Sequence, residues 1–279
     1  MSYKIIVDSC GELTEEMKAS GCFETASLEI DVHGRHIIDD ETFDQAEFLR
    51  LVAESPDSPK SSCPSPERYM EGYRCDAEHV YAVTLSAELS GSYNSAVLGR
   101  NLYHEEYGGK DIYVFNSRSA SIGETLIAMK IVECEEQGME FAQVVETVEA
   151  YIGEQHTYFV LETLDTLRKN GRLTGVKAIV ATALNIKPVM GATPIGTILQ
   201  LGQARGMKKA LTKMVDEIIK DLKEPKKKIL AISHCNCRER AEYVKEMLIK
   251  RADFKDVVIV DTAGISSMYA ADGGVIVVV

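Results

Sequence analysis

Basic residues and long apolar segments are both scarce in this sequence of 279 residues. Lysine and arginine together number 31, against 43 aspartates and glutamates, which gives a formal net charge of −12 at pH 7. A negative charge of this size repels nucleic-acid phosphates and anionic membrane faces, which argues against nucleic acid as the main partner. No stretch reaches the roughly 18 apolar residues that a membrane-spanning helix needs, so we expect no integral membrane segment.

The seven cysteines do not form the pattern of a disulfide framework. They are scattered and odd in number, whereas secreted frameworks usually have an even count in a shorter chain. The first residues, Met1–Asp8, lack the basic-then-apolar pattern of an export signal and are typical of a strand. We therefore expect a cytoplasmic protein.

Motifs of nucleotide-binding and hydrolytic enzymes are absent as well. The sequence has no Gly-x-x-x-x-Gly-Lys-Ser/Thr loop, no strand-linked Gly-x-Gly-x-x-Gly segment and no Gly-x-Ser-x-Gly elbow. Cys235 and Cys237 could bind a metal or act in redox chemistry. However, zinc sites usually use Cys-x-x-Cys spacing, and no second pair of ligands stands out. We predict no metal site and no catalytic residues.

Short apolar runs alternate with segments of helical periodicity along most of the chain. The strand-like runs are Lys4–Val7, His79–Thr84, Asp111–Phe115, Tyr158–Leu161, Lys228–Ser233, Val257–Val260 and Val275–Val279. The helical segments are Glu15–Ser20, Ala46–Ala53, Glu67–Cys75, Tyr93–Tyr107, Glu124–Gln137, Phe141–Gly153, Val176–Leu184, Lys208–Lys223 and Arg238–Arg251. This alternation predicts an α/β fold with mainly parallel sheets flanked by helices.

The length of the chain suits two domains of about 100–150 residues each. Two helical patterns end near Gly153 and a new strand begins, so we expect one α/β domain at residues 1–153 and another at 154–279. Phe23–Ile38 contains His33 and Gly34 between alternating residues, which predicts a hairpin. We expect Ile186–Leu201 to be irregular and partly extended. The proline-rich run Pro56–Pro66 excludes a helix or a central strand.

Three serine-rich segments lie next to predicted strands and helices. They are Ser61–Pro66, Ser86–Ala96 and Asn116–Gly123. In open α/β sheets, ligands bind beyond the carboxyl ends of strands, and free N–H groups at a helix N-terminus favour an anion. Gly91 would let a ligand approach the backbone closely. Because serine before a helix is also a common cap, simple capping remains the alternative for each segment.

Several motifs occur in an order that resembles the DegV family, over nearly the whole chain. Ser61–Ser65 is similar to the family's Thr-Ser-x-Pro-Ser, and Leu89–Ala96 to its Leu-Ser-Gly-Thr-Tyr-x-Ser-Ala. Asn170–Leu173 resembles Gly-Gly-Arg-Ile, and Leu184–Val189 resembles Leu-x-Ile-Lys-Pro-Ile. Gly202–Gly206 is similar to a Lys-x-Arg-Gly stretch. Each match is weak, but the ordered set is fairly specific.

The resemblance implies two α/β domains with a long-chain fatty acid in the cleft between them, the acyl chain covered by the second domain. Related bacterial proteins are the acyl-carrying subunit of fatty acid kinase and present the carboxylate to a separate ATP-dependent partner. Ser61 and Ser90 match carboxylate-binding positions, and Arg172 matches an Arg near the ligand or the kinase-docking face. The ligand-binding residues expected from the resemblance and the serine-rich loops are Ser61, Ser62, Ser90, Gly91, Ser92, Ser119 and Arg172.

We expect the fatty acid to be the ligand and no cofactor to be needed. Burying a tail of about 14–18 carbons at roughly 0.8 kcal/mol per methylene supplies a gross driving force of order 10 kcal/mol, before association costs. Neutral hydroxyls can hold the carboxylate without a buried ion pair, which suits an acidic protein. Candidates for contact with the tail, with ordinary core positions as the alternative, are Ile122, Leu126, Phe159, Ile195 and Ile198.

The sequence departs from the family pattern near its C-terminus. The family usually ends in Gly-x-x-x-x-x-His-x-Gly-Pro-Gly, whereas Ala270 occupies the His position here and Asp272–Gly274 replaces Gly-Pro-Gly; Asn116 also stands where Asp is common. Two alternatives therefore stay open. One is a family member that binds another amphiphile or serves as a regulatory partner. The other is a hydrolase or transferase with Ser90 or Cys63 as nucleophile, although none of the six histidines lies in the serine-rich segments.

Overall fold

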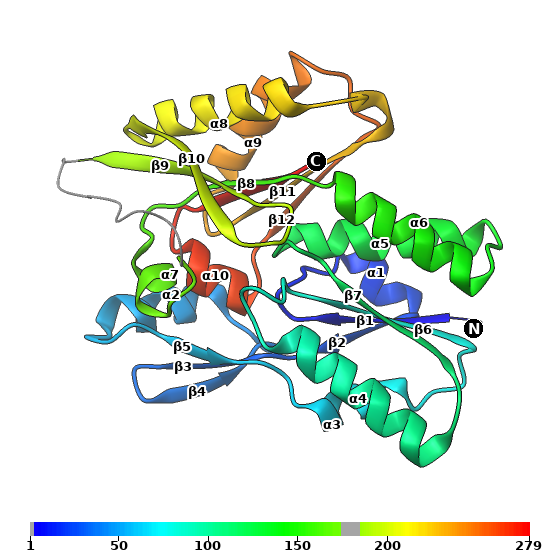
Figure 1. Ribbon diagram of the computed structural model, residues 1–279. Coiled ribbons are helices and arrows are strands. Elements are labelled where there is room, and N and C mark those ends of the chain that lie inside the picture. Colours follow the sequence, from blue (N-terminus) through cyan, green and yellow to red (C-terminus); the bar gives the residue numbers. More distant parts are fainter. Residues whose placement is uncertain (1–2, 174–184) are drawn as a thin grey trace.

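The computed structural model describes residues 3–173 and 185–279 of the chain. It has the α/β class that the alternating pattern predicted (Figure 1). The helix predicted at Val176–Leu184 lies outside the described residues. The strands form three sheets. Two of them use strands that end by Asn116, and the other uses strands that begin at Thr157. The domain boundary that we expect between residues 153 and 154 remains a prediction.

The first sheet is parallel throughout, as predicted. Its order is β2-β1-β6-β7, formed by β1 (Tyr3–Asp8), β2 (Phe23–Ala26), β6 (His79–Thr84) and β7 (Asp111–Asn116). The predicted hairpin at Phe23–Ile38 was wrong for its first part, because β2 pairs in parallel with β1. The short helix α1 (Glu15–Ser20), capped by the Thr14 side chain, provides the crossover that a parallel pair requires.

A small antiparallel sheet holds the proline-rich segment. Its order is β4-β3-β5, with β3 (Glu29–Val32), β4 (Arg35–Ile38) and β5 (Lys60–Ser62). The hairpin prediction is confirmed for β3 and β4, whose turn residues His33 and Gly34 have φ of 50° and 72°. Positive φ at both central positions suits the twist of a two-residue hairpin. The strand within the proline-rich run is the edge strand β5, which places Ser61 opposite Ile30.

The second large sheet is mostly antiparallel, so the prediction of a mainly parallel sheet was wrong for the C-terminal half. Its order is β10-β9-β8-β13-β11-β12, with β8 (Thr157–Val160), β9 (Ile186–Ala192), β10 (Ile198–Arg205), β11 (Ile229–His234), β12 (Asp256–Asp261) and β13 (Val275–Val278). Of its described pairings, β11 with β12 is parallel and the others are antiparallel. The physical reason is that the last strand, β13, inserts between β8 and β11 and runs against both.

The stretch Ile186–Leu201 is regular, contrary to our expectation. It forms most of the β9–β10 hairpin, with the turn between Ala192 and Ile198. Pro188 is tolerated because β8 pairs with β9 only at Met190 and Gly191, so at Pro188 the strand has β10 as its described neighbour. A proline that faces no second ladder removes little hydrogen bonding.

The helices arrange the two large sheets in layers (Figure 1). On the outer face of the first sheet lie α3 (Pro66–Tyr73) and α4 (Ser92–Tyr107), and on that of the second lie α8 (Met207–Asp221) and α9 (Arg238–Ile249). Between the sheets lie α5 (Ile122–Glu136), with α6 (Phe141–Glu154) beside it. The other helices are α2 (Gln45–Glu54), α7 (Asp165–Lys169), η1 (Pro225–Lys227) and α10 (Gly264–Ala270).

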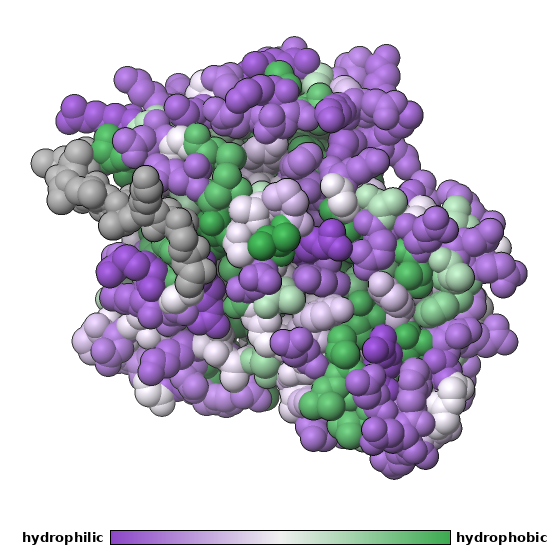
Figure 2. Space-filling model, viewed as in Figure 1, coloured by the Kyte–Doolittle hydropathy of each residue, from purple (hydrophilic) through white to green (hydrophobic). Residues whose placement is uncertain are grey.

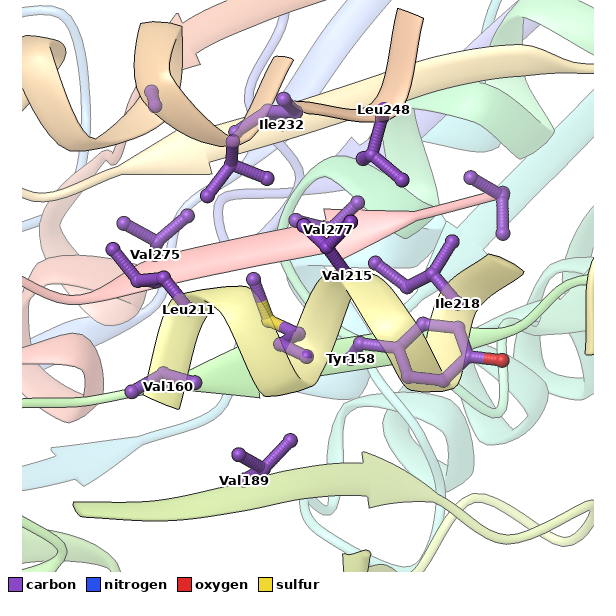
Figure 3. Close-up of a cluster of buried hydrophobic side chains, with 14 of the residues drawn as sticks. Tyr158, Val160, Val189, Leu211, Val215, Ile218, Ile232, Leu248, Val275 and Val277 are labelled. Atoms are coloured by element: carbon purple, nitrogen blue, oxygen red, sulfur yellow. The ribbon is translucent and has the colours of Figure 1, made fainter. Parts of the chain in front are cut away.

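Helix α5 has buried residues on nearly every side, which explains its weak amphipathic pattern. Ile127 and Ile131 pack on the first sheet, whereas Ile122 and Leu126 pack against Ala231 and Val278 of the second. On the far side of the second sheet, side chains of β13 and α8 interdigitate, with Val275 and Val277 close to Leu211 and Val215 (Figure 3). Because α5 packs on both sheets, these apolar clusters fix the position of one large sheet relative to the other.

Candidate functional site

Two adjoining cavities lie where the strand-end loops of the first sheet meet α7, α10 and the second sheet. The first, called the serine cavity, encloses about 610 Å³ free of protein atoms, part of it open to solvent. Its lining includes Leu28, Ser61, Ser62, Cys63, Ser90 and Gly91. The second, called the apolar cavity, encloses about 720 Å³, also partly open. Both are lined by Leu85, Leu89, Arg172, Ile265 and Tyr269, which form a neck between them.

Hydrophobic side chains predominate in the lining of the apolar cavity. Besides the neck residues it is lined by Cys10, Arg118, Ser119, Ala120, Ser121, Thr157, Phe159, Leu161, Leu167, Ala192, Gly196, Ile198, Ser266, Ala270 and Ile276. The turn between β9 and β10 closes over it, because Ser86 Oγ donates to the Gly196 carbonyl at 2.9 Å. Gly196 has φ of 91°, and a Cβ there would stand 2.8 Å from Arg118 Cα, so only glycine fits.

The structure brings together five of the seven predicted ligand-binding residues. Ser61, Ser62, Ser90, Gly91 and Arg172 all line the serine cavity. Ser90 and Gly91 are placed there by the loop from β6 to α4, and Ser61 by its edge strand. Arg172 follows α7, and its Nε donates to the Leu89 carbonyl at 3.2 Å. The binding roles of these residues remain predictions.

The other two predicted ligand-binding residues lie elsewhere. Ser119 lines the apolar cavity, where its Oγ is 2.6 Å from Thr157 Oγ1. Ser92 is buried and lines neither cavity; its Oγ donates to Asp8 Oδ2 at 2.5 Å and lies 2.6 Å from the Tyr69 hydroxyl. Ser92 therefore joins α4 and α3 to the end of β1.

Of the five residues predicted to contact the acyl tail, two line the apolar cavity and three do not. Phe159 and Ile198 line the apolar cavity. Ile122 and Leu126 belong to the core between the sheets, and Ile195 is 62% exposed at the hairpin turn. Ala270, at the position of the family His, is buried in the wall of the apolar cavity.

Tyr269 is a neck residue that the sequence analysis missed. Its hydroxyl lies 3.4 Å from Ser61 Oγ, and the Arg172 Cζ atom stands 6.0 Å from its ring centroid. Tyr269 is near the end of α10, in the segment where the family motif breaks down. The only signal in the sequence was its place directly before Ala270.

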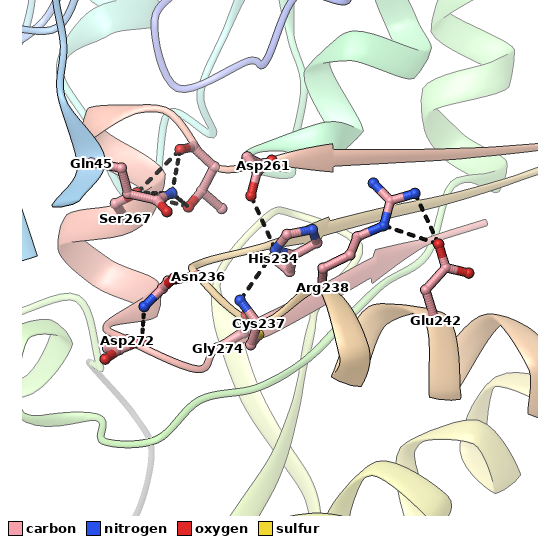
Figure 4. A network of polar contacts seen from close by, with 11 residues as sticks. Gln45, His234, Asn236, Cys237, Arg238, Glu242, Asp261, Ser267, Asp272 and Gly274 are labelled. Atoms are coloured by element: carbon pink, nitrogen blue, oxygen red, sulfur yellow. Dashed lines mark hydrogen bonds and ion pairs between the residues drawn. The ribbon is translucent and has the colours of Figure 1, made fainter.

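Helix α10 is anchored to the N-terminal half of the chain. The buried Asp39 carboxylate accepts hydrogen bonds from the Gly264 and Ile265 N–H groups at 2.7 and 2.8 Å. Burial raises the pKa of Asp39 to about 6, although these two hydrogen bonds oppose the shift. Gln45 Nε2 on α2 donates to the Thr262 carbonyl at 2.9 Å (Figure 4). These contacts fix the helix that carries Tyr269.

A buried polar chain crosses between the sheets and includes Ser121, a residue in the wall of the apolar cavity. Ser121 Oγ lies 2.9 and 2.8 Å from the two Glu12 carboxyl oxygens and 2.7 Å from Ser233 Oγ on β11. Burial raises the pKa of Glu12 to about 7, and hydrogen bonds with Ser266 and Ser121 oppose the shift.

The raised pKa of Glu12 predicts a specific pH dependence. The folded pKa, about 7, exceeds the ordinary value of 4.5, so the stabilising contribution of the protonated group is complete below pH 4.5 and is lost as the pH rises through 7. The loss is on the order of 3 kcal/mol. Glu12→Gln cannot release this proton, so its free energy of unfolding should exceed that of the wild type at pH 8 and approach it near pH 4.5.

Urea unfolding at pH 4.5, 6 and 8 measures this difference. Glu16→Gln is the matched control, because Glu16 lies exposed in the first turn of α1, and it should follow the wild type throughout. A Glu12→Gln protein whose difference from the wild type does not change between pH 4.5 and 8 would contradict the assignment.

Cys235 and Cys237 lie just after the end of β11, and neither belongs to a group of metal ligands among the described residues. Cys235 is fully buried, and Cys237 Sγ donates to the Gly274 carbonyl at 3.3 Å. Burial raises the pKa of both thiols, that of Cys237 to about 12, so both are protonated at neutral pH. His234 Nδ1 instead lies 3.3 Å from Asp261 Oδ1 (Figure 4). Within residues 3–173 and 185–279, no group of three or more His, Cys, Asp or Glu side chains could hold a metal ion.

Hydrophilic residues dominate the face of the molecule drawn in Figure 2, with hydrophobic residues gathered in separate patches. Among the helices of the described residues, none is long and apolar enough to cross a membrane.

Comparison with known proteins finds similarity along the whole chain. The family model described as "Uncharacterised protein, DegV family" matches residues 2–279. A DegV domain-containing protein of Streptococcus pneumoniae serotype 4 is 32% identical over 280 residues, which is 99% of this chain and 98% of that protein.

Two solved structures are also similar. A DegV family protein from Ruminococcus gnavus, refined with vaccenic acid, is 64% identical, with full coverage of both chains and a TM-score of 0.98. The S. pneumoniae Fatty Acid Kinase (Fak) B3 protein, loaded with linoleic acid, is 30% identical, with coverage of 100% of this chain and 99% of that one and a TM-score of 0.88. With the order of motifs and the fold, these matches show that the chain belongs to the DegV family.

Proposed function

We propose that this protein binds a long-chain fatty acid across the two cavities, with the carboxylate in the serine cavity and the acyl chain in the apolar cavity. The observation that carries the proposal is the shared neck, which joins a hydroxyl-lined space to a hydrophobic one. An amphiphile with a small polar head and one long tail fits this sequence of surfaces. The fatty acids in the R. gnavus and Fak B3 structures support the same ligand class.

The serine cavity suits a carboxylate despite the net charge of −12. Ser61 and Ser90 offer hydroxyl donors, whereas the Ser62 hydroxyl donates to Glu29 Oε2 at 3.3 Å. Arg172 is the only charged residue in the described lining of this cavity. Hydrogen bonds to an ionised acceptor are stronger than those between neutral groups, so a few donors suffice. A single cation at the neck also favours an anionic head over a neutral one.

Binding without turnover is the better interpretation of the same lining. Among the described residues that line the two cavities there is no histidine, aspartate or glutamate. A serine or cysteine nucleophile needs a base within hydrogen-bond reach, and no such base faces Ser90 or Cys63 there. We therefore propose a cytoplasmic, non-catalytic carrier that presents its fatty acid to a separate ATP-dependent kinase subunit, as the name of Fak B3 suggests.

Mass spectrometry of an organic-solvent extract of the freshly purified protein tests the proposal. We expect stoichiometric long-chain fatty acid, and a matching excess in the native mass of the intact protein. A folded protein that yields no lipid and takes up no added fatty acid would exclude this ligand class. Covalent labelling of Ser90 or Cys63 by an acyl-enzyme-trapping reagent would instead favour the hydrolase alternative.

A further inference from the structure

Tyr269 stands at the boundary between the polar and the apolar space. It lines both cavities and is half-buried near the end of α10. Its ring packs against two hydrophobic clusters, one around the β3–β4 hairpin and α2, and one around Phe159 and Leu161. Tyrosine suits such a boundary, because its ring is apolar and its hydroxyl needs a polar partner.

The polar contacts of Tyr269 point toward the serine cavity. In the part of the chain that the structure describes, its hydroxyl has one hydrogen-bond partner, Ser61 Oγ at 3.4 Å. Both hydroxyls can donate, and only one proton can lie between them, so the other stays free for an acceptor. The guanidinium of Arg172 stands over the ring, which brings a cation within 6.0 Å of the same tyrosine.

We propose that Tyr269 is a head-group ligand that selects an ionised carboxylate. When the carboxylate binds, it replaces the hydrogen bond between the two hydroxyls, so that Tyr269 and Ser61 both donate to it, while the Tyr269 ring holds Arg172 beside the head group. This inference rests on the proposed fatty-acid binding. It states that the Tyr269 hydroxyl makes the protein bind a fatty acid more tightly than a neutral lipid. Ala270, the next residue, has no polar side chain. Of the two neck residues on α10, Ile265 and Tyr269, Tyr269 is the one whose side chain can donate.

Titration with oleic acid and with oleyl alcohol, its neutral analogue, tests the inference on the intact protein. Tyr269→Phe keeps the ring and removes the donor. We expect its affinity for oleic acid to fall about 10-fold or more, as for a lost hydrogen bond to a charged group, and its affinity for oleyl alcohol to change less than about 3-fold. Tyr113→Phe is the matched control, because the Tyr113 hydroxyl donates to Glu149 at 3.1 Å and lines neither cavity.

The outcomes separate this inference from the proposed function. A Tyr269→Phe protein that binds oleic acid as tightly as the wild type overturns the inference and leaves fatty-acid binding standing. Equal losses for the acid and the alcohol overturn it too, because they indicate only packing. A wild-type protein that binds neither ligand overturns both proposals.

A double-mutant cycle with Ser61→Ala gives a second measurement. If both hydroxyls hold one carboxylate, the loss in Tyr269→Phe/Ser61→Ala should differ from the product of the two single losses by 2-fold or more. Strict multiplication of the two losses would contradict a shared head group.

Discussion

Replacing Ser61 and Ser90 together by alanine is expected to weaken fatty-acid binding by at least about 100-fold. Both side chains line the serine cavity, from the edge strand β5 and from the loop before α4. Each hydroxyl donated to a carboxylate contributes about 1.5–3 kcal/mol, so losing two costs about 3–6 kcal/mol of binding free energy. Titration of the lipid-free protein with oleic acid, followed by intrinsic tyrosine fluorescence or calorimetry, measures the change.

The matched control for this prediction is Ser95→Ala. Ser95 lies on α4, one helical turn after Ser90 and Gly91, and it is absent from the lining of both cavities. Its affinity for oleic acid should stay within about 3-fold of the wild type. Unchanged affinity in a folded Ser61→Ala/Ser90→Ala protein would show that the carboxylate binds elsewhere. Ser92→Ala separates a structural from a binding role, because Ser92 bonds Asp8 and should affect stability rather than affinity.

That Ser90 and Gly91 line a cavity at the sheet edge was largely predictable, because their place depends on local rules. Loops that follow parallel strands meet at one edge of the sheet, and Ser90 and Gly91 follow β6. The local rules do not predict the place of Ser92, because its side chain bonds a residue far away in the sequence. Its partner, Asp8, is 84 positions away on β1, and nothing in the spacing of the serines reveals that bond.

The direction of the C-terminal strands was not predictable from the alternation of strand-like and helical segments in the sequence. A helix between two strands permits a parallel pair, and this held for β11, α9 and β12. The sheet became mostly antiparallel because β13 inserts between β8 and β11, a choice made by tertiary packing. Periodicity records which face of a strand is buried and carries no information about its neighbour.

The family motif explains why Tyr269 was missed. The family motif draws attention to the His position, now Ala270, whose side chain has no polar atom. The structure instead shows a tyrosine one position earlier, oriented by the anchoring of α10 at Asp39. Side chains at adjacent positions of a helix point in directions about 100° apart. The family motif therefore does not indicate that Tyr269, and not the side chain at position 270, reaches Ser61; the packed structure does.

The walls of the apolar cavity outside the neck should limit the longest acyl chain that binds. Ala192, at the end of β9, lines the apolar cavity and not the serine cavity. Phenylalanine there would fill space that about four methylenes of a long tail would use. At about 0.8 kcal/mol per methylene, Ala192→Phe should weaken stearic or oleic acid binding by on the order of 100-fold.

The chain length of the ligand makes this prediction specific. Decanoic acid has a shorter tail that needs less of the apolar cavity, so it should bind Ala192→Phe and the wild type within about 3-fold. It therefore serves as the internal control for folding and for the head-group site. Ala53→Phe, at an exposed position on α2, is the matched control and should leave both affinities unchanged. Competition titrations with saturated acids of 10 to 18 carbons measure the profile. An equal loss of affinity at every chain length would indicate that Ala192→Phe disturbs the neck or the folding of the protein. An unchanged profile would indicate that the acyl tail binds outside the apolar cavity.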